Sequence, residues 1–260
     1  MDAFRLDDQV AVITGGSKGI GKAIGLAFAE AGADVVLAAR SEEDLSKAAA
    51  EVEAAAPGRR AVTVPTDVGD PEQIQALIDR ATAEFGSFDI LVNNAGAAPF
   101  SATIDSMRPE GFEKYFRVNF VSAWYATRAA APVLLGKGSG CVLNVASVAS
   151  FIATPGISYY GSAKAALVSL TRTVAQEWAG SGVRVNAIAP GWIDTDLNAM
   201  LRASPDVERQ ILMQIPMGRW GRADEVAGAA VFLCSPGASF ITGATLVVDG
   251  GQTVNSRFGA

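Results

Sequence analysis

The stretch Val10-Ala-Val-Ile-Thr14-Gly15-Gly-Ser-Lys-Gly-Ile-Gly21 decides the fold class of this 260-residue chain. A short apolar run is followed by a glycine-rich loop and then by an alanine-rich helical pattern over 19–31. Gly15 permits a tight turn, Gly19 lets the backbone approach a pyrophosphate, and Gly21 allows the helix to pack closely on the strand. The first N–H groups of the helix are free to bind phosphate. This strand–loop–helix context predicts a nucleotide-binding loop.

Short β-branched runs alternate with longer helical patterns along the rest of the chain, as in βαβ units. Strands are predicted at Val10–Thr14, Asp34–Ala39, Ala61–Val64, Ile90–Val92, Cys141–Ala146, Arg184–Ala189 and Thr245–Val248. Helices are predicted at 19–31, 42–56, 71–85, 110–135, 158–179 and 223–234. The pattern indicates an α/β fold, namely a doubly wound parallel sheet of about seven strands with helices on both faces, in a single domain over 1–260.

One segment departs from this alternation. Residues 192–217 form a connection longer than is usual between a strand and a helix, and they carry Trp192, Met200, Met213 and Met217. An insertion at the carboxyl edge of a parallel sheet commonly covers a ligand. We therefore expect 192–217 to cover the substrate.

The composition excludes several classes of function. Charged residues make up 18% and the net charge is −6, so no basic face for nucleic acid or an anionic membrane is expected. No apolar run approaches the ~18 residues of a membrane span, and the start of the chain lacks a signal-peptide pattern, which predicts a cytoplasmic location. Without histidine, a Ser-His-Asp triad or a His-ligated zinc site is impossible. Cys141 and Cys234 lie in apolar context and are predicted to be buried free thiols.

A second motif, Tyr160-Gly-Ser-Ala-Lys164 preceded by Ser147, is typical of proton transfer without histidine. On a helix, Tyr160 and Lys164 share one face, and an ammonium beside a phenol is expected to lower the pKa of the phenol from near 10. Tyr159 adjoins Tyr160 but has no lysine four residues later, so it points elsewhere. A hydroxyl at Ser147 can hydrogen-bond a carbonyl oxygen that gains negative charge.

Several motifs now agree in order and spacing. With Asn93-Asn94-Ala95-Gly96, Asn119, Ser147, Tyr160, Lys164 and Pro190-Gly191-x-x-x-Thr195, the chain resembles the single-domain short-chain dehydrogenases/reductases over residues 8–251. The resemblance implies a Rossmann sheet, a nicotinamide cofactor and a Ser-Tyr-Lys site completed by an asparagine. It implies that Lys164 also holds the nicotinamide ribose and that Asn119 anchors a water linking Lys164 to solvent.

The predicted site contains residues from eight separate parts of the chain. The expected catalytic residues are Asn119, Ser147, Tyr160 and Lys164. The expected cofactor-binding residues are Gly15, Ser17, Lys18, Gly19, Ile20, Gly21, Arg40, Asp67, Val68, Asn93, Ala95, Gly96, Tyr160, Lys164, Pro190, Gly191, Ile193 and Thr195. By resemblance, Asp67 and Val68 border the adenine, and Ile193 and Thr195 hold the nicotinamide carboxamide. For Asn93 the alternative is a purely structural amide at a strand end.

Charge selects the form of the cofactor. NAD-preferring sheets of this kind place an acid at the end of the second strand, where this chain has Ala39 followed by Arg40. Arg40 can bind a 2′-phosphate in a bidentate manner and Lys18 can add a second positive charge, which favours NADP(H). Glu42 and Glu43 follow closely, and pairing of either with Arg40 would weaken phosphate binding.

The motifs favour hydride transfer from NADPH to a neutral or apolar ketone flanked by Ala97, Pro99, Val148, Ala149, Phe151 and Trp192. Two alternatives remain: an alcohol or sugar dehydrogenase that works oxidatively with NAD(P), and a non-catalytic NADP-binding sensor module. Enoyl reduction is disfavoured because the members of the family that reduce enoyl groups space the tyrosine and the lysine more widely. Docking to an acidic carrier protein is disfavoured because Pro132 and Gln176 stand where the carrier-dependent reductases present arginines. The resemblance also implies a homotetramer built on the helices at 110–135 and 158–179 and on the last strand.

Overall fold

The computed structural model describes residues 2–254, and its centre is one seven-stranded sheet with the order β3-β2-β1-β4-β5-β6-β7. All neighbouring strands are parallel. The strands are β1 Val10–Thr14, β2 Asp34–Ala39, β3 Ala61–Pro65, β4 Ile90–Asn93, β5 Gly140–Val145, β6 Val183–Pro190 and β7 Thr245–Val248. The predicted doubly wound fold is confirmed, and each strand boundary lies within one residue of its predicted position.

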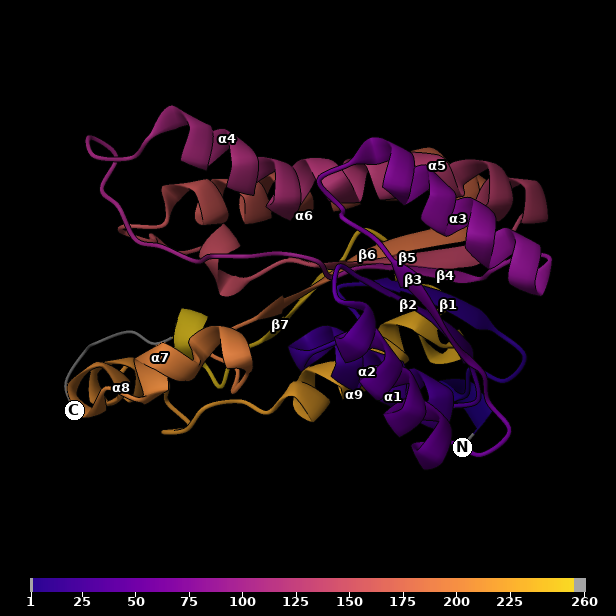
Figure 1. The fold of residues 1–260 in the computed structure, drawn as a ribbon, viewed down its shortest axis with the longest axis horizontal. Helices are drawn as coiled ribbons and strands as arrows, with labels where there is room; N and C mark the ends of the chain where they lie inside the picture. Colours follow the sequence, from indigo (N-terminus) through magenta and orange to yellow (C-terminus); the bar gives the residue numbers. More distant parts are fainter. Residues whose placement is uncertain (1, 255–260) are drawn as a thin grey trace.

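Helices cover both faces of the sheet. In Figure 1, α1 Gly19–Glu30, α2 Glu42–Ala55 and α9 Ala223–Cys234 lie on one side, and α3 Pro71–Phe85, α5 Ser122–Lys137 and α6 Ser158–Trp178 lie on the other. Successive strand residues point to opposite faces, so Ile13 packs against α1 and α9 whereas Val12 packs against α3 and α5. Both faces of the five inner strands are buried, which explains their nearly continuous apolar sequences, whereas the edge strands β3 and β7 are only partly buried.

The structure corrects the predicted helix at 110–135. This region consists of α4 Pro109–Phe116, a π-helical segment at Arg117–Val121, and α5, which continues to Lys137. Within the π-helical segment lies the buried Asn119, and Ser122 donates a 2.7 Å hydrogen bond to the carbonyl of Val118. Such π segments are often found at functional sites, and a widened turn leaves no clear trace in an apolar pattern of period 3.6.

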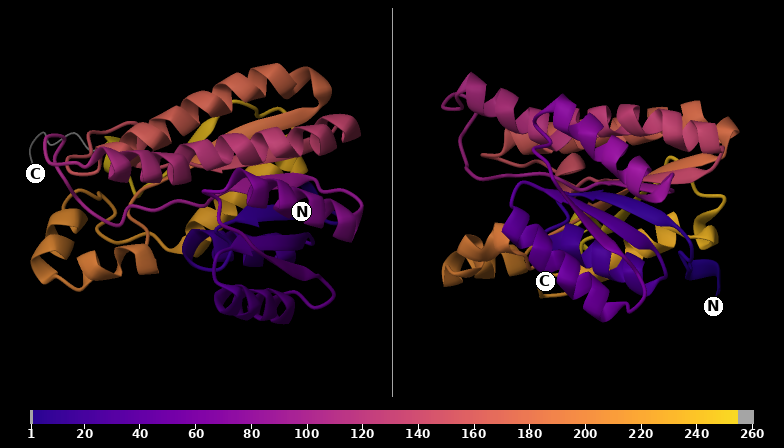
Figure 2. Two further views of the ribbon diagram at one scale, coloured as in Figure 1. Left: turned by 45° about the horizontal axis from the view of Figure 1, so that its top comes forward. Right: turned by 45° about the vertical axis from the view of Figure 1, so that its right-hand side comes forward.

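The segment 192–217 is partly helical, which the sequence analysis did not predict. It contains a 3-10 turn at Asp196–Asn198, the short helix α7 Ala199–Arg202 and α8 Pro205–Leu212. Helices of one or two turns are too short for a periodic apolar pattern to reveal them. In two further views, α7 and α8 project from the body of the molecule at one end of the sheet (Figure 2).

The strand order reverses between β1 and β4, since the chain runs outward to β3 on one side and to β7 on the other. In such sheets the crevice for ligands opens beyond the carboxyl ends of the strands at this reversal. The loops after β1 and β4 therefore face the same crevice. Within residues 2–254, no helix combines the length and the apolar character needed to span a membrane.

Replacing Gly21 by alanine is expected to destabilise the fold. A Cβ at this position would collide with the carbonyl oxygen of Gly15 and with Nδ2 of Asn94, neither of which can withdraw cheaply. We expect Gly21→Ala to lower the free energy of unfolding by about 1–3 kcal/mol, measured by urea denaturation at fixed protein concentration.

Gly228→Ala is the matched control, since Gly228 lies within α9 and, among residues 2–254, nothing outside its own helical backbone comes within 4 Å of the place that a Cβ would take. This control should be neutral or stabilising by up to about 1 kcal/mol, because alanine is the better helix former. Equal stability of the two variants would contradict the close approach inferred at Gly21.

Candidate active site

The glycine-rich loop after β1 is fastened to the end of β4. Thr14 Oγ1 donates to the carbonyl of Val92 (3.2 Å) and accepts from the backbone N–H of Asn94 (3.0 Å). The Asn94 side chain donates in return to the carbonyls of Thr14 (2.9 Å) and Gly15 (3.0 Å). Four hydrogen bonds thus fix the loop across the strand reversal. The sequence analysis named Asn94 within its motif but gave Thr14 no role.

The loop itself is a cradle lined by backbone. Gly15 has φ +66° and Gly19 has φ +53°, conformations that side chains rarely adopt. A Cβ on Gly19 would lie 3.3 Å from Cγ2 of Thr195, so the predicted Thr195 rests directly against the loop. Ser17 and Ile20 are half-buried in the same loop and first helical turn. This narrow cradle at a helix N-terminus has the chemistry to hold a pyrophosphate.

Arg40 follows β2 and is exposed, and its guanidinium forms no ion pair with a carboxylate of residues 2–254. Glu43 pairs with Lys47 (2.6 Å) instead, so the pairing that would have weakened phosphate binding is absent from this described part of the chain. Lys18 is the partnered cation, since its Nζ lies 2.8 Å from Oδ2 of Asp44. Asp44 was missed, although an acid in the first turn of α2 is visible in the sequence.

Ser147 and Tyr160 are brought together as predicted. Ser147 follows β5, is buried, and caps the 3-10 turn Val148–Ser150 by accepting from the N–H of Ala149 (3.2 Å). Tyr160 lies in the first turn of α6. Burial of its hydroxyl raises the pKa of Tyr160 above 10, and the hydrogen bond with Ser147 opposes that rise only in part. The phenol is therefore protonated at neutral pH.

Lys164 lies one turn later on α6 and is only 3% exposed. Its Nζ donates to the carbonyl of Val145 (2.7 Å) and lies 5.7 Å from the centre of the Tyr160 ring. Burial lowers the pKa of Lys164 from 10.5 to about 8. The expected lowering of the Tyr160 pKa is thus wrong for this structure, because burial disfavours the phenolate and is the largest influence on that pKa, and Lys164 is not among the groups that lower it.

Asn119 lies close to Lys164 across Gly96. The Asn119 side chain accepts from the N–H of Ala97 (3.0 Å) and donates to the carbonyls of Ala97 and Tyr115 (both 2.8 Å). A Cβ on Gly96 would lie 2.7 Å from Oδ1 of Asn119 and 3.4 Å from Nζ of Lys164. Gly96 therefore leaves the gap through which these two polar groups can share a ligand or a water.

Three predicted cofactor residues border one small cavity. Val68, Asn93 and Ala95 line it together with Thr14, Ser122 and Ala123. Asn93 also donates to Asn144 (2.9 Å), so the structural role considered for it is real, yet its Oδ1 is buried with no partner within residues 2–254. Asp67 precedes Val68 in the loop after β3, where the Asp67 carboxylate accepts from the N–H of Gly69 (2.9 Å).

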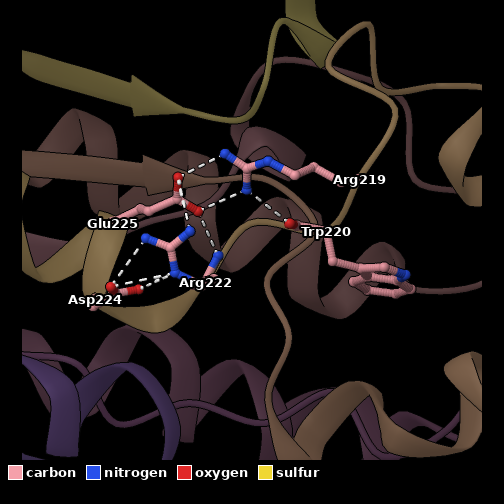
Figure 3. A network of polar contacts seen from close by, with 5 residues as sticks. All are labelled: Arg219, Trp220, Arg222, Asp224 and Glu225. Atoms are coloured by element: carbon pink, nitrogen blue, oxygen red, sulfur yellow. Dashed lines mark hydrogen bonds and ion pairs between the residues drawn. The ribbon is translucent and has the colours of Figure 1, made fainter.

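The segment carrying Pro190, Gly191 and Ile193 is held by the chain that leads into α9. Gly191 donates to the carbonyl of Val248 (3.0 Å), and the segment 192–194 pairs with Gly221 through hydrogen bonds of 2.9 and 2.8 Å. Figure 3 shows the contacts of residues on either side of Gly221: Arg219 binds both carboxylate oxygens of Glu225 (2.7 and 2.8 Å), and Glu225 also accepts from the N–H of Arg222 (2.8 Å). The Arg219 hydrogen bonds are the main cause that lowers the pKa of Glu225 to about 2.

The insertion 192–217 exposes apolar side chains. Met200 is 88% exposed, and Leu197, Met213 and Met217 are also exposed. A cavity of about 350 Å³ opens beside the insertion, bounded among others by Trp192, Met217 and Val247. Exposed methionines on short helices provide an adaptable apolar surface.

Comparisons with known proteins show the family of the chain. A protein-family model described as enoyl-(acyl carrier protein) reductase matches residues 15–253. An uncharacterized oxidoreductase of Mycobacterium tuberculosis is 44% identical over 254 residues, which are 97% of this chain and 95% of that protein. A 3-oxoacyl-[acyl-carrier-protein] reductase of Synechocystis sp. is 39% identical over 96% of this chain and 98% of its own.

A solved structure is similarly close. The gluconate 5-dehydrogenase of Burkholderia cenocepacia in complex with NADP and tartrate has a TM-score of 0.92 and 37% identity, over 98% of this chain and 99% of its own. The sequence relatives and the family model each span nearly the whole chain, and the fold matches throughout. The chain belongs to the short-chain dehydrogenase/reductase family.

Proposed function

We propose that this protein is an NADPH-dependent carbonyl reductase in which Tyr160 protonates the oxygen of a neutral or largely apolar ketone. The observation that carries this proposal is the convergence of Ser147, a protonated Tyr160 and the buried Lys164 on one end of α6, next to the glycine cradle. A non-catalytic sensor module would need only the cradle that binds the cofactor. The presence of the assembled proton-transfer groups therefore disfavours that alternative.

The residues present fit an NADP(H) cofactor. The cradle of Gly15, Gly19 and Gly21 has no room for side chains, and Arg40 offers a guanidinium that no described carboxylate neutralises. The structural neighbour from Burkholderia cenocepacia, solved in complex with NADP, is consistent with this preference. When bound, the nicotinamide supplies a hydride to the carbonyl carbon. Ile193, Thr195 and Lys164 would hold its ring and ribose.

The protein groups supply the proton and orient the oxygen. Because burial keeps Tyr160 protonated at neutral pH, it is in the donor form that reduction needs. Ser147 hydrogen-bonds Tyr160 and would orient the same carbonyl oxygen. Lys164 would return a proton to Tyr160 through a water, and Asn119 stands across Gly96 to hold that water.

The charge of the insertion supports a neutral substrate. Its arginines and those of the following loop are each paired with a carboxylate: Arg202 with Asp194, Arg209 with Asp206, Arg219 with Glu225 and Arg222 with Asp224. None of these four is left to clamp a carboxylate or phosphate of a ligand. Phe151, which follows the turn begun by Ser147, is exposed and offers an apolar contact instead.

The second candidate is an alcohol or sugar dehydrogenase. The same groups catalyse the reverse reaction when Tyr160 is deprotonated, and the structural neighbour from Burkholderia cenocepacia is a gluconate 5-dehydrogenase. Oxidation would gain from high pH, because the raised pKa of Tyr160 keeps the phenolate scarce at neutral pH. Enoyl reduction is not proposed, since Tyr160 and Lys164 stand only one helical turn apart.

We also propose a cytoplasmic homotetramer. Exposed apolar side chains on α5 and on the edge strand β7 support assembly: Trp124, Leu246 and Val247 are all more than a third exposed. An edge strand with apolar residues is a surface that proteins usually cover. The cytoplasmic location stays a prediction from the sequence.

Removing the phenol oxygen should stop the reaction. We expect Tyr160→Phe to lower kcat by about 10²–10⁴-fold while NADPH still binds, because the proton donor is lost and the ring remains. NADPH oxidation is followed by absorbance against ketones, β-ketoesters, quinones, steroids and keto-sugars. Tyr125→Phe on α5 is the control for loss of a tyrosine hydroxyl away from the site, and it should keep wild-type turnover. Turnover that survives in Tyr160→Phe would refute the proposed donor.

Arg40 should decide between the two cofactors. We expect Arg40→Ala to raise the Kd of NADPH by about 10–100-fold and to leave the Kd of NADH within about twofold, since only NADPH carries the 2′-phosphate. Titration calorimetry with each cofactor measures both values. Asp44→Asn should have the opposite effect. It removes the carboxylate that pairs with Lys18, and we expect the Kd of NADPH to fall by about 2–5-fold. Equal losses for NADPH and NADH in Arg40→Ala would contradict the preference.

The buried Lys164 should cost stability in a pH-dependent manner. Its pKa is lowered to about 8, so the folded state binds fewer protons than the unfolded state between pH 8 and about 10.5, and stability rises with pH across that window. Below pH 8 the buried ammonium costs about 3 kcal/mol relative to the neutral amine, as the shift from 10.5 to about 8 implies. We expect Lys164→Met to be inactive yet more stable than wild type at pH 7, with a gap that shrinks towards pH 10 in urea denaturation. A stability difference between Lys164→Met and wild type that does not change with pH would rule out the buried ammonium as its cause.

A further inference from the structure

Tyr159, the neighbour of Tyr160, is fully buried and is not used by the proposed reaction. Its relative exposure is 0%, and its hydroxyl donates a 2.7 Å hydrogen bond to the carbonyl of Phe100. Consecutive residues of a helix point about 100° apart, so the same turn of α6 directs Tyr160 toward Ser147 and Tyr159 toward the segment after β4.

An aromatic cluster reinforces this contact. The rings of Phe100 and Tyr159 stack with centroids 4.8 Å apart and an interplanar angle of 28°. Tyr115 of α4 packs edge-on against Phe100 (5.4 Å, 68°) and also contacts Tyr159 (5.7 Å). Aromatic pairs of this kind prefer defined relative orientations, so the cluster fixes the direction of the chain at Phe100 as well as its position.

The segment 97–102 has no regular secondary structure, and three contacts hold it. Asn119 binds both backbone groups of Ala97, Tyr159 binds the carbonyl of Phe100, and Ala102 donates to the carbonyl of Gly156 (2.8 Å). The first contact comes from Asn119, which faces Lys164 across Gly96, and the third comes from the loop that leads into α6. The contact from Tyr159 is the middle one, and it is the only one of these three made by a side chain of α6.

We propose that Tyr159 is a positioning residue that fixes segment 97–102 beside Tyr160 and thereby sets the affinity for the carbonyl substrate, not the rate of the chemical step. This inference rests on the proposed function, in which Ala97 and Pro99 flank the substrate. One helical turn then carries both the proton donor and the support of the facing wall of the substrate site. A shift of the helix would move donor and wall together, which keeps their separation constant.

Tyr159→Phe tests the proposal, because it keeps the ring in the cluster and removes only the hydrogen bond to Phe100. We expect amide hydrogen exchange of a peptide covering 97–107 to become at least fivefold faster. For ethyl acetoacetate, a neutral β-ketoester, we expect KM to rise by about 5–10-fold while kcat stays within twofold, from the loss of one hydrogen bond. The Kd of NADPH and the pH profile of kcat should not change, since both belong to other groups.

Tyr115→Phe is the matched control. It removes a hydroxyl from the same cluster, and within residues 2–254 that hydroxyl makes no hydrogen bond. Its exchange rates and its KM should stay within twofold of wild type.

Unchanged exchange of 97–107 in Tyr159→Phe would overturn the proposal. A fall in kcat at constant KM would also overturn it, because Tyr159 would then act through Tyr160, and so would faster exchange with an unaltered KM. If wild type does not reduce ethyl acetoacetate, the proposed substrate class fails in that assay. The exchange measurement then decides by itself whether Tyr159 holds the segment.

Discussion

The hydrogen bonds between Thr14 and Asn94 join the ends of β1 and β4 at the point where the strand order reverses, and the rest of the site depends on this junction. At a reversal the two following loops diverge, so the crevice between them is open unless side chains fill it. Glycines at 15, 19 and 21 keep it open, and the Asn94 amide holds the loop carbonyls in place. The N-terminus of α1 is thereby aimed at a fixed point. Thr195 follows the carboxyl end of β6 and lies against Gly19, so it also bounds the cradle.

The polar groups of the site are buried at a cost in stability that the fold offsets elsewhere. Lys164 is 3% exposed and has one hydrogen bond, to Val145, and Gly96 leaves space between it and Asn119. A buried ammonium of this kind is unfavourable for folding, and apolar packing on both faces of the sheet outweighs it. The same burial explains the state of Tyr160, whose raised pKa keeps it protonated. Low solvation thus costs stability at Lys164 and, in the proposed reaction, keeps Tyr160 in the form that can donate a proton.

The substrate side is built differently from the cofactor side. Backbone groups and glycines form the cradle, whereas the side proposed to bind the substrate depends on side-chain contacts that hold irregular chain, namely the aromatic cluster around Phe100. Irregular chain tolerates change in sequence far better than a strand end does. Relatives with this fold accordingly include a 3-oxoacyl-[acyl-carrier-protein] reductase and a gluconate 5-dehydrogenase.

The sequence by itself determined the sheet, its strands to within a residue, the glycine loop and the placement of Tyr160 and Lys164 on one helical face, because these depend on local periodicity and on glycine sterics. It did not reveal the π-helical segment around Asn119 or the helices α7 and α8, since short or widened turns leave no periodic signal. It also misjudged the pKa of Tyr160, because spacing shows which groups are neighbours but not how much water reaches them. The partners of Lys18, Lys164 and Tyr159, namely Asp44, Val145 and Phe100, were decided only by tertiary structure. Each of these contacts joins elements that are distant in sequence, and only packing of the helices on the sheet sets their separation.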